Sequence, residues 1–354
     1  MCNRSLSVIL LTAFLSTSCG PGTTKPDPVN PGLEIEFNDK QADKQVDVLI
    51  SGKLFTSFMW PDSVFKPILY PVYTSEGTEI TRGFPLKPRE GESTDHRHQV
   101  GIWLNYGNVN GFDFWGNGSE GKKSPNGGVI KHLNIEKVTE GSGEGSLISN
   151  ESWVDPDGKE LMTEKTEYHF LAEGTVRIID RLTTLTATAG PVNFKDTKEG
   201  MFGIRVARQL QLPTKEDIVL KEASGGTTTV KPSTGGDITG NYRSSEGITG
   251  VGVWGTRARW MNLYGIIGNE KVSLIVCDHP ENISYPTYWH AREYGLFAAN
   301  PLGAKDFTEG KEEVNFSIPA GGSVTIRYRV IVNSGEDLTD AEINKYADAF
   351  AEKY

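Results

Sequence analysis

The feature that most restricts the fold is a series of short runs in which apolar and polar residues alternate. In Ser323–Val332, every second residue from Val324 is apolar or aromatic, and Thr325, Arg327 and Arg329 lie between them. This period is typical of a strand with one buried face. Further runs of this kind are Leu33–Phe37, Val46–Ile50, Leu69–Val72, Thr78–Arg82, Val129–Val138, Leu147–Val154, Leu161–Phe170, Val176–Ala187, Phe202–Leu212 and Val272–Cys277.

The connections between these runs carry turn chemistry, and helical patterns do not alternate with them. Asp155-Pro156-Asp157-Gly158, for example, is a strong turn signal. Such connections favour antiparallel sheets packed face to face over a parallel α/β sheet. The sequence therefore predicts an all-β protein, with one large antiparallel β-sandwich over residues 33–354.

One helix is expected, at the C-terminal end. Thr339 and Glu342 have the spacing of a capping box. After them, Ile343, Tyr346, Phe350 and Tyr354 recur at helical spacing. We expect a helix over 339–354 whose apolar stripe docks on the sandwich.

The first 32 residues have the pattern of an export signal and a tether. Arg4 precedes the apolar run Leu6–Leu15, and the residues up to Cys19 resemble a bacterial lipobox. We expect residues 1–18 to be a lipoprotein signal peptide, Cys19 to carry the lipid anchor, and residues 19–32 to be a flexible tether. The alternative is an ordinary cleaved secretory peptide. The first reading places the protein at the bacterial cell envelope, anchored at the outer membrane or facing the periplasm.

The charge and the cysteines exclude some classes of partner. A formal net charge of -10 argues against nucleic acid and against electrostatic binding to anionic lipid. Membrane contact is thus expected only through the lipid anchor. After Cys19 only Cys277 remains, so a mature chain could form no internal disulfide.

The segment 94–116 holds the densest group of residues that could do chemistry. Asp95, His96 and His98 are followed by Trp103, Asn110 and Trp115. If the segment is a strand, His96 and His98 project from one face and could share a ligand, a metal or a proton relay. The competing interpretation is a pair of hydrogen-bonded structural histidines.

Two later segments resemble it in composition. Residues 196–208 contain Glu199 and Arg205, and residues 278–300 contain Trp289, His290, Arg292 and Tyr294. Carboxylates, imidazoles, asparagines and aromatic rings in the loops of a β domain are typical of a carbohydrate site, where rings stack on sugar C–H surfaces and polar groups contact hydroxyls.

A set of motifs resembles one known family. DHRHQVGIW, GNVNGFDFW, DTKEGMFGIRVA, VWGTRARW and DHPENISYPTYWHAREYGLFAANP resemble the DUF6807 family, often labelled "methane oxygenase PmoA", over about residues 45–335. The resemblance implies a supersandwich-like fold akin to aldose-1-epimerases, and a secreted or lipid-anchored bacterial protein encoded near carbohydrate-processing genes. The family has no settled activity. Its first motif usually reads Asp-His-x-His-His, and Gln99 stands here in place of the third histidine.

The oxygenase label does not fit the sequence. A membrane oxygenase subunit needs spanning helices, and no segment after residue 18 has the run of about 18 apolar residues that spanning requires. We therefore expect that the protein is not a methane oxygenase.

The leading hypothesis is a carbohydrate-active enzyme, either mutarotase-like or glycoside-cleaving. Both reactions need one group that takes a proton and one that gives a proton. We expect Glu199 to be the base, His98 or His290 the acid, and His96 to orient its neighbour. The expected substrate-binding residues are Asp95, Trp103, Asn110, Trp115, Arg205, Trp289, Arg292 and Tyr294.

Two other hypotheses remain. The same loops could belong to a non-catalytic glycan-binding lipoprotein with structural histidines. Alternatively, and compatibly with either, His96 and His98 with His290 or His279 could bind a divalent metal, because imidazoles suit zinc and similar cations.

Overall fold

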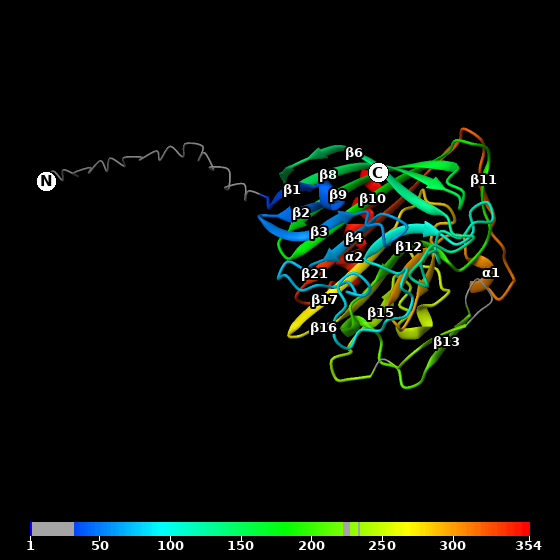
Figure 1. Cartoon of the computed structure of the whole chain (residues 1–354). Helices are drawn as coiled ribbons and strands as arrows, with labels where there is room; N and C mark the ends of the chain where they lie inside the picture. Colours follow the sequence, from blue (N-terminus) through cyan, green and yellow to red (C-terminus); the bar gives the residue numbers. More distant parts are fainter. Residues whose placement is uncertain (2–31, 222–226, 233) are drawn as a thin grey trace. The chain divides into compact units, whose positions relative to one another are not determined.

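Two large antiparallel sheets account for most of the strands (Figure 1). The computed structural model describes Met1 and residues 32–221, 227–232 and 234–354, apart from the side chains of residues 218, 220 and 221. Residues 2–31, which hold the expected signal peptide, Cys19 and all of the tether but Gly32, lie outside the described residues. Residues 32–354 cluster as one compact unit.

The first sheet has nine strands. In spatial order they are β18 (Tyr288–Ala291), β19 (Leu296–Asn300), β12 (Gly200–Arg205), β5 (Ile102–Tyr106), β4 (Ile68–Val72), β3 (Lys53–Met59), β2 (Gln45–Ile50), β1 (Glu34–Lys40) and β7 (Gly141–Ser142). The order brings β5, β12 and β18 into neighbouring positions although they are far apart in the sequence.

The second sheet has eight strands. In order they are β15 (Asn241–Ser244), β16 (Trp260–Ile267), β17 (Glu270–Asp278), β21 (Ser323–Ser334), β10 (Val176–Ala187), β9 (Glu160–Glu173), β8 (Glu144–Val154) and β6 (Val129–Thr139). Two small pairs join β11 (Val192–Phe194) to β20 (Phe316–Ile318) and β13 (Ile218–Lys221) to β14 (Thr227–Val230). Short 3₁₀ helices lie at Gln41–Asp43, Arg208–Leu210 and Gly250–Val253.

The main core lies between the two large sheets. Phe202 of β12 stacks on Tyr328 of β21, with ring centroids 4.8 Å apart. Phe58 of β3 meets Tyr168 of β9 at 5.7 Å. Ring contacts between strands of different sheets are the packing expected of a sandwich, in which inner-face residues interdigitate. The predicted fold class is thereby confirmed.

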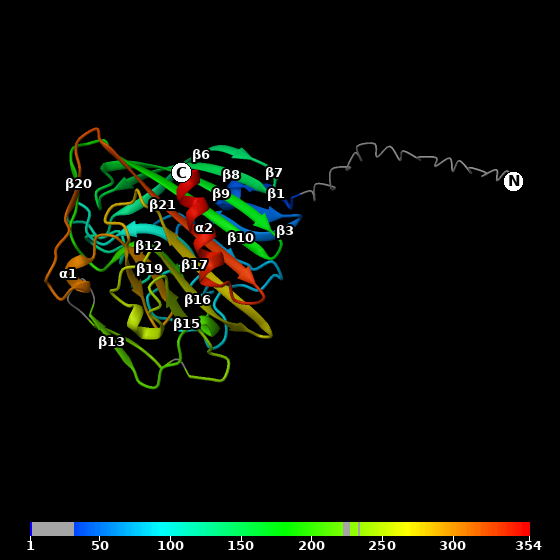
Figure 2. The same cartoon turned by 180° about the vertical axis from the view of Figure 1, so that it is seen from behind.

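The outer face of the eight-stranded sheet is covered by the C-terminal helix. Helix α2 (Asp340–Lys353) buries Ile343, Ala347 and Phe350 against apolar side chains of β10, β16, β17 and β21 (Figure 2). Thr339 caps it through the predicted box with Glu342. A second, four-residue helix, α1, spans Ala304–Phe307. In the part of the chain that the structure describes, no helix combines the length and apolar character needed to cross a membrane.

The outer face of the nine-stranded sheet carries different chemistry. Strand register aligns His290 of β18 with Ala298, Ala298 with Gly203, and Gly203 with Trp103 of β5. Their neighbours in each strand, such as Trp289 and Phe297, point into the main core because successive side chains alternate between faces. This row places His290 and Trp103 on one face of the sheet. Only the methyl group of Ala298 and the hydrogen of Gly203 lie between them.

Two predicted strands differ in the structure. Thr78–Arg82 forms only isolated bridges, Glu79 with Tyr73 and Thr81 with Val206. The run from Phe202 begins within β12, which ends at Arg205, and a 3₁₀ helix follows at Arg208–Leu210. The apolar pattern of Phe202–Leu212 extends beyond the end of β12 because Leu210 and Leu212 are buried in the core although they are not in a strand.

Candidate functional site

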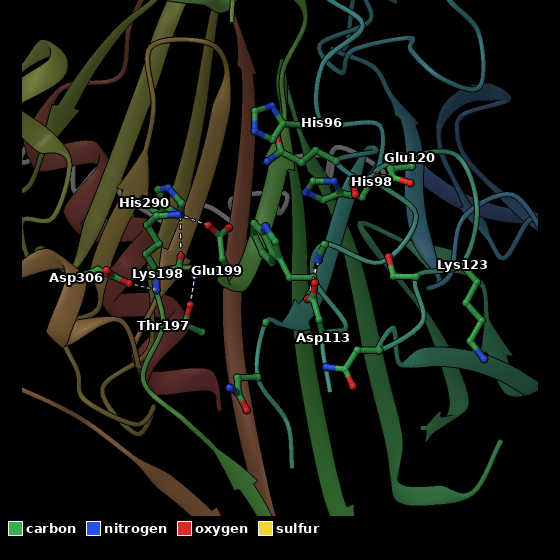
Figure 3. A pocket seen from close by; sticks show the side chains of 18 of the residues that line it. His96, His98, Asp113, Glu120, Lys123, Thr197, Lys198, Glu199, His290 and Asp306 are labelled. Atoms are coloured by element: carbon green, nitrogen blue, oxygen red, sulfur yellow. Dashed lines mark hydrogen bonds and ion pairs between the residues drawn. The ribbon is translucent and has the colours of Figure 1, made fainter. Parts of the chain in front are cut away.

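A cavity of about 940 Å³ contains the four residues predicted to be catalytic (Figure 3). His96 and His98 come from the segment before β5, Glu199 precedes β12, and His290 lies in β18. Polar side chains dominate the lining. The full set is His96, His98, Gln99, Gly107, Asn108, Gly111, Asp113, Trp115, Gly116, Ser119, Glu120, Lys122, Lys123, Ser124, Pro125, Asn126, Asp196, Thr197, Lys198, Glu199, Val219, His290, Arg292, Tyr294 and Asp306.

The His96–His98 segment is a turn, so the condition that it forms a strand is not met. His96 has a φ of 41°, in the left-handed region, and Gln99 N donates to its carbonyl oxygen over 2.9 Å. Strand β5 begins only at Ile102. The two imidazoles are still neighbours, with ring centroids 5.8 Å apart, because the turn folds them together.

Asp95 and Arg205 form a buried support behind His96. Arg205 Nη2 donates to both carboxylate oxygens of Asp95, at 2.9 and 3.0 Å, and Arg82 Nη1 reaches Oδ1 at 3.1 Å. His96 Nδ1 lies 2.5 Å from Asp95 Oδ2. Neither Asp95 nor Arg205 lines the cavity, so their predicted role in contacting substrate is not supported. They hold His96 in place instead.

The charges around Asp95 keep it ionised. Burial alone would raise its pKa, but Arg205, the hydrogen bond with His96 and Arg82 outweigh burial and hold the pKa well below its usual range. A permanent carboxylate therefore accepts the Nδ1 proton of His96. Nε2 of His96 is the ring nitrogen that does not face Asp95.

His290 and Glu199 share the opposite wall through Lys198. His290 Nδ1 donates to the carbonyl oxygen of Lys198 over 2.8 Å. Lys198 Nζ forms an ion pair with Glu199, and the backbone oxygen of Glu199 accepts from Gly107 N at 2.7 Å. The backbone at Lys198 and Glu199 is therefore tied to β18 and to Gly107 after β5, and Lys198 holds the Glu199 carboxylate.

His98 and His290 are neutral imidazoles. Burial lowers the pKa of both well below the usual value, and nearby cations, Lys66 for His98 and Lys198 for His290, lower it further. At neutral pH each ring carries a single proton and can accept a hydrogen bond at its other nitrogen, but it has no second proton to give.

The aromatic residues divide into two groups. Trp115 and Tyr294 line the cavity, and the Tyr294 ring stacks on His96 with centroids 5.1 Å apart. Trp103 lies beneath Trp115, at 5.3 Å, and is fully buried. Trp289 belongs to the main core and donates from Nε1 to Ala258 O. The expected stacking roles of Trp103 and Trp289 are thus wrong.

Asn110 does not line the cavity and Arg292 does. The Asn110 side chain is used locally, accepting from Asn193 N at 2.8 Å. Arg292 packs its guanidinium 5.8 Å from the Tyr294 ring centroid. Of the residues expected to bind substrate, Trp115, Arg292 and Tyr294 reach the cavity.

Sequence reasoning missed several lining residues, notably Lys198, Asp113 and Asn108. Lys198 adjoins Glu199 and could have been found from that adjacency. Asp113 accepts from Gly116 N at 2.8 Å, and burial raises its pKa. Its fixed position depends on a turn within a glycine-rich loop, which residue spacing does not reveal.

The expected metal site does not assemble. Among the described residues, no group of three or more His, Cys, Asp or Glu side chains could hold a metal ion.

Comparison with curated proteins found no match. Matching solved structures include the Slr1438 protein of Synechocystis sp. PCC 6803, at 9% identity and a TM-score of 0.30, covering 86% of this chain and 96% of that one. A galactose mutarotase related enzyme from Lactobacillus acidophilus matches at 5% identity and 0.31, covering 85% and 97%. The GH36 α-galactosidase AgaA of Geobacillus stearothermophilus matches at 12% and 0.33, covering 80% of this chain and 40% of the enzyme.

These structural likenesses are too distant to carry an argument about activity. The sequence gives a firmer assignment. A family model described as a family of unknown function, DUF6807, matches residues 45–348, which is most of the chain and includes every predicted catalytic residue. The chain belongs to the DUF6807 family.

Proposed function

We propose that this protein is a carbohydrate-active enzyme that uses acid–base chemistry on a cyclic sugar or a glycoside. The observation that carries the proposal is the meeting of Glu199, His96, His98 and His290, from three distant segments, around one cavity. Residues that can move protons gather in a hollow of this kind when chemistry is done there, and a polar cavity with ring walls suits a hydroxylated ligand.

The proposed roles follow from the hydrogen bonds. Glu199 is the general base, held by Lys198. Since His98 and His290 are neutral, the donor role expected for one of them passes to His96. The Asp95 carboxylate stabilises the His96 ring whenever Nε2 carries a second proton, as the acid does in a catalytic triad.

The same pair serves either reaction. In ring opening, Glu199 takes the proton of the anomeric hydroxyl, the C1–O5 bond breaks as C1=O forms, and His96 gives a proton to O5. In glycoside cleavage, His96 protonates the leaving oxygen while Glu199 takes a proton from the attacking water. Neutral His290 accepts hydrogen bonds from substrate hydroxyls at Nε2.

Binding would use the ring walls and the polar lining. Trp115 and Tyr294 line the wall but are only 1% and 2% exposed. Asn108, Asn126 and Ser124 provide polar groups that can contact sugar hydroxyls. The cavity volume lies in the upper part of the range for ligand pockets, about 300–1,000 Å³, which leaves room for more than one sugar ring. The proposal also keeps the location expected from the sequence, at the bacterial cell envelope with lipid on Cys19.

A substrate screen tests the proposal. Purified protein is offered aldoses, glycosides and keto-sugars, and mutarotation and reducing-sugar release are followed. The substitution Glu199→Gln removes the base but keeps the shape, and we expect it to lower turnover by about a hundredfold or more. Glu352→Gln, at an exposed position on α2, is the matched control.

One outcome would reject Glu199 as the base, and another would reject the enzyme. Full turnover by Glu199→Gln would show that the base lies elsewhere. Glycan binding with no turnover, unaffected by replacing His96 and His98 with Gln, would favour the non-catalytic glycan-binding lipoprotein.

A further inference from the structure

The His96–His98 end of the cavity is backed by three buried cations. Lys66, Arg82 and Arg205 are 3%, 1% and 0% exposed. Cationic side chains are almost never buried to this degree unless their charge serves a purpose or is paired.

All three cations are directed at the turn that carries the histidines. Lys66 Nζ donates to His98 O at 2.6 Å, and Arg82 Nη2 donates to His96 O at 2.9 Å. Arg205 Nη1 donates to the Gln99 side-chain oxygen at 2.5 Å. The positive charge therefore lies directly behind the cavity wall.

Among the described residues, fewer negative than positive side chains are in contact here. Across residues 32–221, 227–232 and 234–354, Asp95 is the only carboxylate that forms ion pairs with any of the three. Asp113 acts on Lys66 only at longer range, and burial favours its neutral form. Burial lowers the pKa of Lys66 to about 7, and burial with the charge of Arg205 lowers that of Arg82 to about 9. At pH 7 an amine whose pKa is about 7 is only partly protonated, so Lys66 contributes only part of a positive charge.

Arg292 brings this positive charge to the cavity surface. It lines the cavity, and its guanidinium carbon lies 5.8 Å from the centroid of the Tyr294 ring. Arg205 lies 4.7 Å from the same centroid, and His96 stacks on that ring. Arg292 Nε also lies 3.3 Å from the Glu293 carboxylate, which compensates part of its charge.

Two of the acidic lining residues, Asp196 and Asp306, lie on another wall. Asp306 accepts from Lys198 N at 2.9 Å, and Asp196 accepts from Lys305 N and Val314 N. Figure 3 shows Asp306 beside Lys198, apart from His96 and His98. Backbone donors thus occupy the Asp196 and Asp306 carboxylates, whereas Arg292 lines the cavity near Tyr294 and His96.

We propose that the substrate carries a carboxylate, as a uronic acid residue does, and that this group binds to Arg292 at the His96 end of the cavity. Guanidinium groups bind carboxylates in a paired geometry that neutral hydroxyls do not match. The buried cations behind the turn add to the attraction. This inference rests on the proposed function, because it names the class of sugar for the same cavity.

Matched sugar pairs test it directly. The affinity of the full chain is measured by isothermal titration calorimetry for D-galacturonate against D-galactose, and for D-glucuronate against D-glucose. We expect the acid of at least one pair to bind about tenfold or more tightly than its neutral partner. The preference should shrink as salt is raised from 50 to 500 mM because added ions screen the attraction.

Variants assign the preference to Arg292. Arg292→Gln should abolish it, and Arg292→Lys should keep part of it. Lys345→Gln, at an exposed position on α2, should leave it unchanged. If Arg292→Gln fails to fold, the matched sugars on the unaltered protein still decide the question.

Equal affinity within both pairs, or no binding of either uronate, overturns the inference. Failure of the uronate inference can be distinguished from failure of the proposed function. Turnover of neutral sugars without a uronate preference would reject the carboxylate alone, whereas a uronate preference without any turnover would reject the enzyme alone.

Discussion

His290 Nδ1 lies 2.8 Å from the carbonyl oxygen of Lys198, the residue that precedes Glu199 in the chain. A carbonyl oxygen can only accept, so the ring carries its proton on Nδ1 and presents an unprotonated Nε2. One hydrogen bond therefore fixes the tautomer of His290 and ties its strand to the segment that positions Glu199.

This tautomer should matter for turnover. Replacing His290 with Asn keeps a donor for the Lys198 carbonyl but removes the ring lone pair. We expect kcat to fall by about tenfold, the scale of one lost hydrogen bond to the substrate. Steady-state kinetics on the substrate found in the screen measures this. His169→Asn, on β9 and outside the cavity lining, should leave kcat unchanged. Wild-type kcat in His290→Asn would remove His290 from the mechanism.

Asp95→Asn should destabilise the protein in a pH-dependent way. The substitution leaves the Arg205 and Arg82 charges buried without their carboxylate, which costs about 3–5 kcal/mol at pH 7. The pKa of Asp95 is depressed in the folded state, so its stabilisation is complete above the unfolded value of about 3.9 and shrinks as the pH falls below it.

Urea unfolding at pH 7, 4 and 3 checks this. The difference between wild type and Asp95→Asn should be largest at pH 7 and smallest at pH 3. Asp348→Asn removes an exposed ion pair with Arg259 and should cost no more than about 1 kcal/mol. If the two proteins differed by the same free energy of unfolding at all three pH values, the stabilisation would not depend on ionisation of Asp95.

Glu151→Gln should stabilise the protein at alkaline pH. Glu151 is buried directly opposite Glu164 in the β8–β9 pairing, and burial with the Glu164 charge raises its pKa well above the usual value. His132, 3.2 Å away, gives no positive charge because burial lowers its pKa to about 4. A raised carboxyl pKa contributes stability at low pH that is lost as the pH rises.

The melting temperatures at pH 5 and pH 8 test this. We expect Glu151→Gln to gain more than about 1 kcal/mol over wild type at pH 8, and less at pH 5. Glu167→Gln, on the same strand as Glu164, is the control. Destabilisation of Glu151→Gln at pH 8 would show that the ionised carboxylate is well accommodated.

Gly203→Ala should disturb the layer beneath the cavity. A Cβ at residue 203 would lie 2.5 Å from Cζ2 of Trp103, whose ring packs under Trp115. Overpacking of this kind costs about 1–3 kcal/mol, and displacement of Trp115 should also weaken sugar binding. Gly236→Ala, where an added Cβ meets nothing within 4 Å, should be near neutral by urea unfolding. Equal stability of the two variants would contradict the packing described here.

The sequence predicted the strands of the sandwich and the capped helix because both depend on local periodicity. Val324–Val332 and Thr339–Glu342 formed as expected. It also identified His96, His98, Glu199 and His290, since clustered titratable residues in a β-protein's loops are conspicuous.

The predictions failed where tertiary contacts decide which side chains reach the site. Trp103 and Trp289 were expected in the site, but strand parity and the layer above them bury both. His96 and His98 meet through a left-handed turn held by Arg82, which lies 14 residues earlier than His96 and was not predicted to contribute. Arg205 supports the same turn from β12 through Asp95, a partner 110 residues away.

The most direct test of the proposed site is a crystal structure of the Glu199→Gln variant with a bound sugar from the screen. We predict a sugar in the cavity, with its anomeric carbon's oxygens within about 2.6–3.2 Å of the residue 199 side chain and of His96 Nε2. A sugar bound outside this cavity, or bound in it with both groups out of reach of the ring and anomeric oxygens, would contradict the proposed site and mechanism.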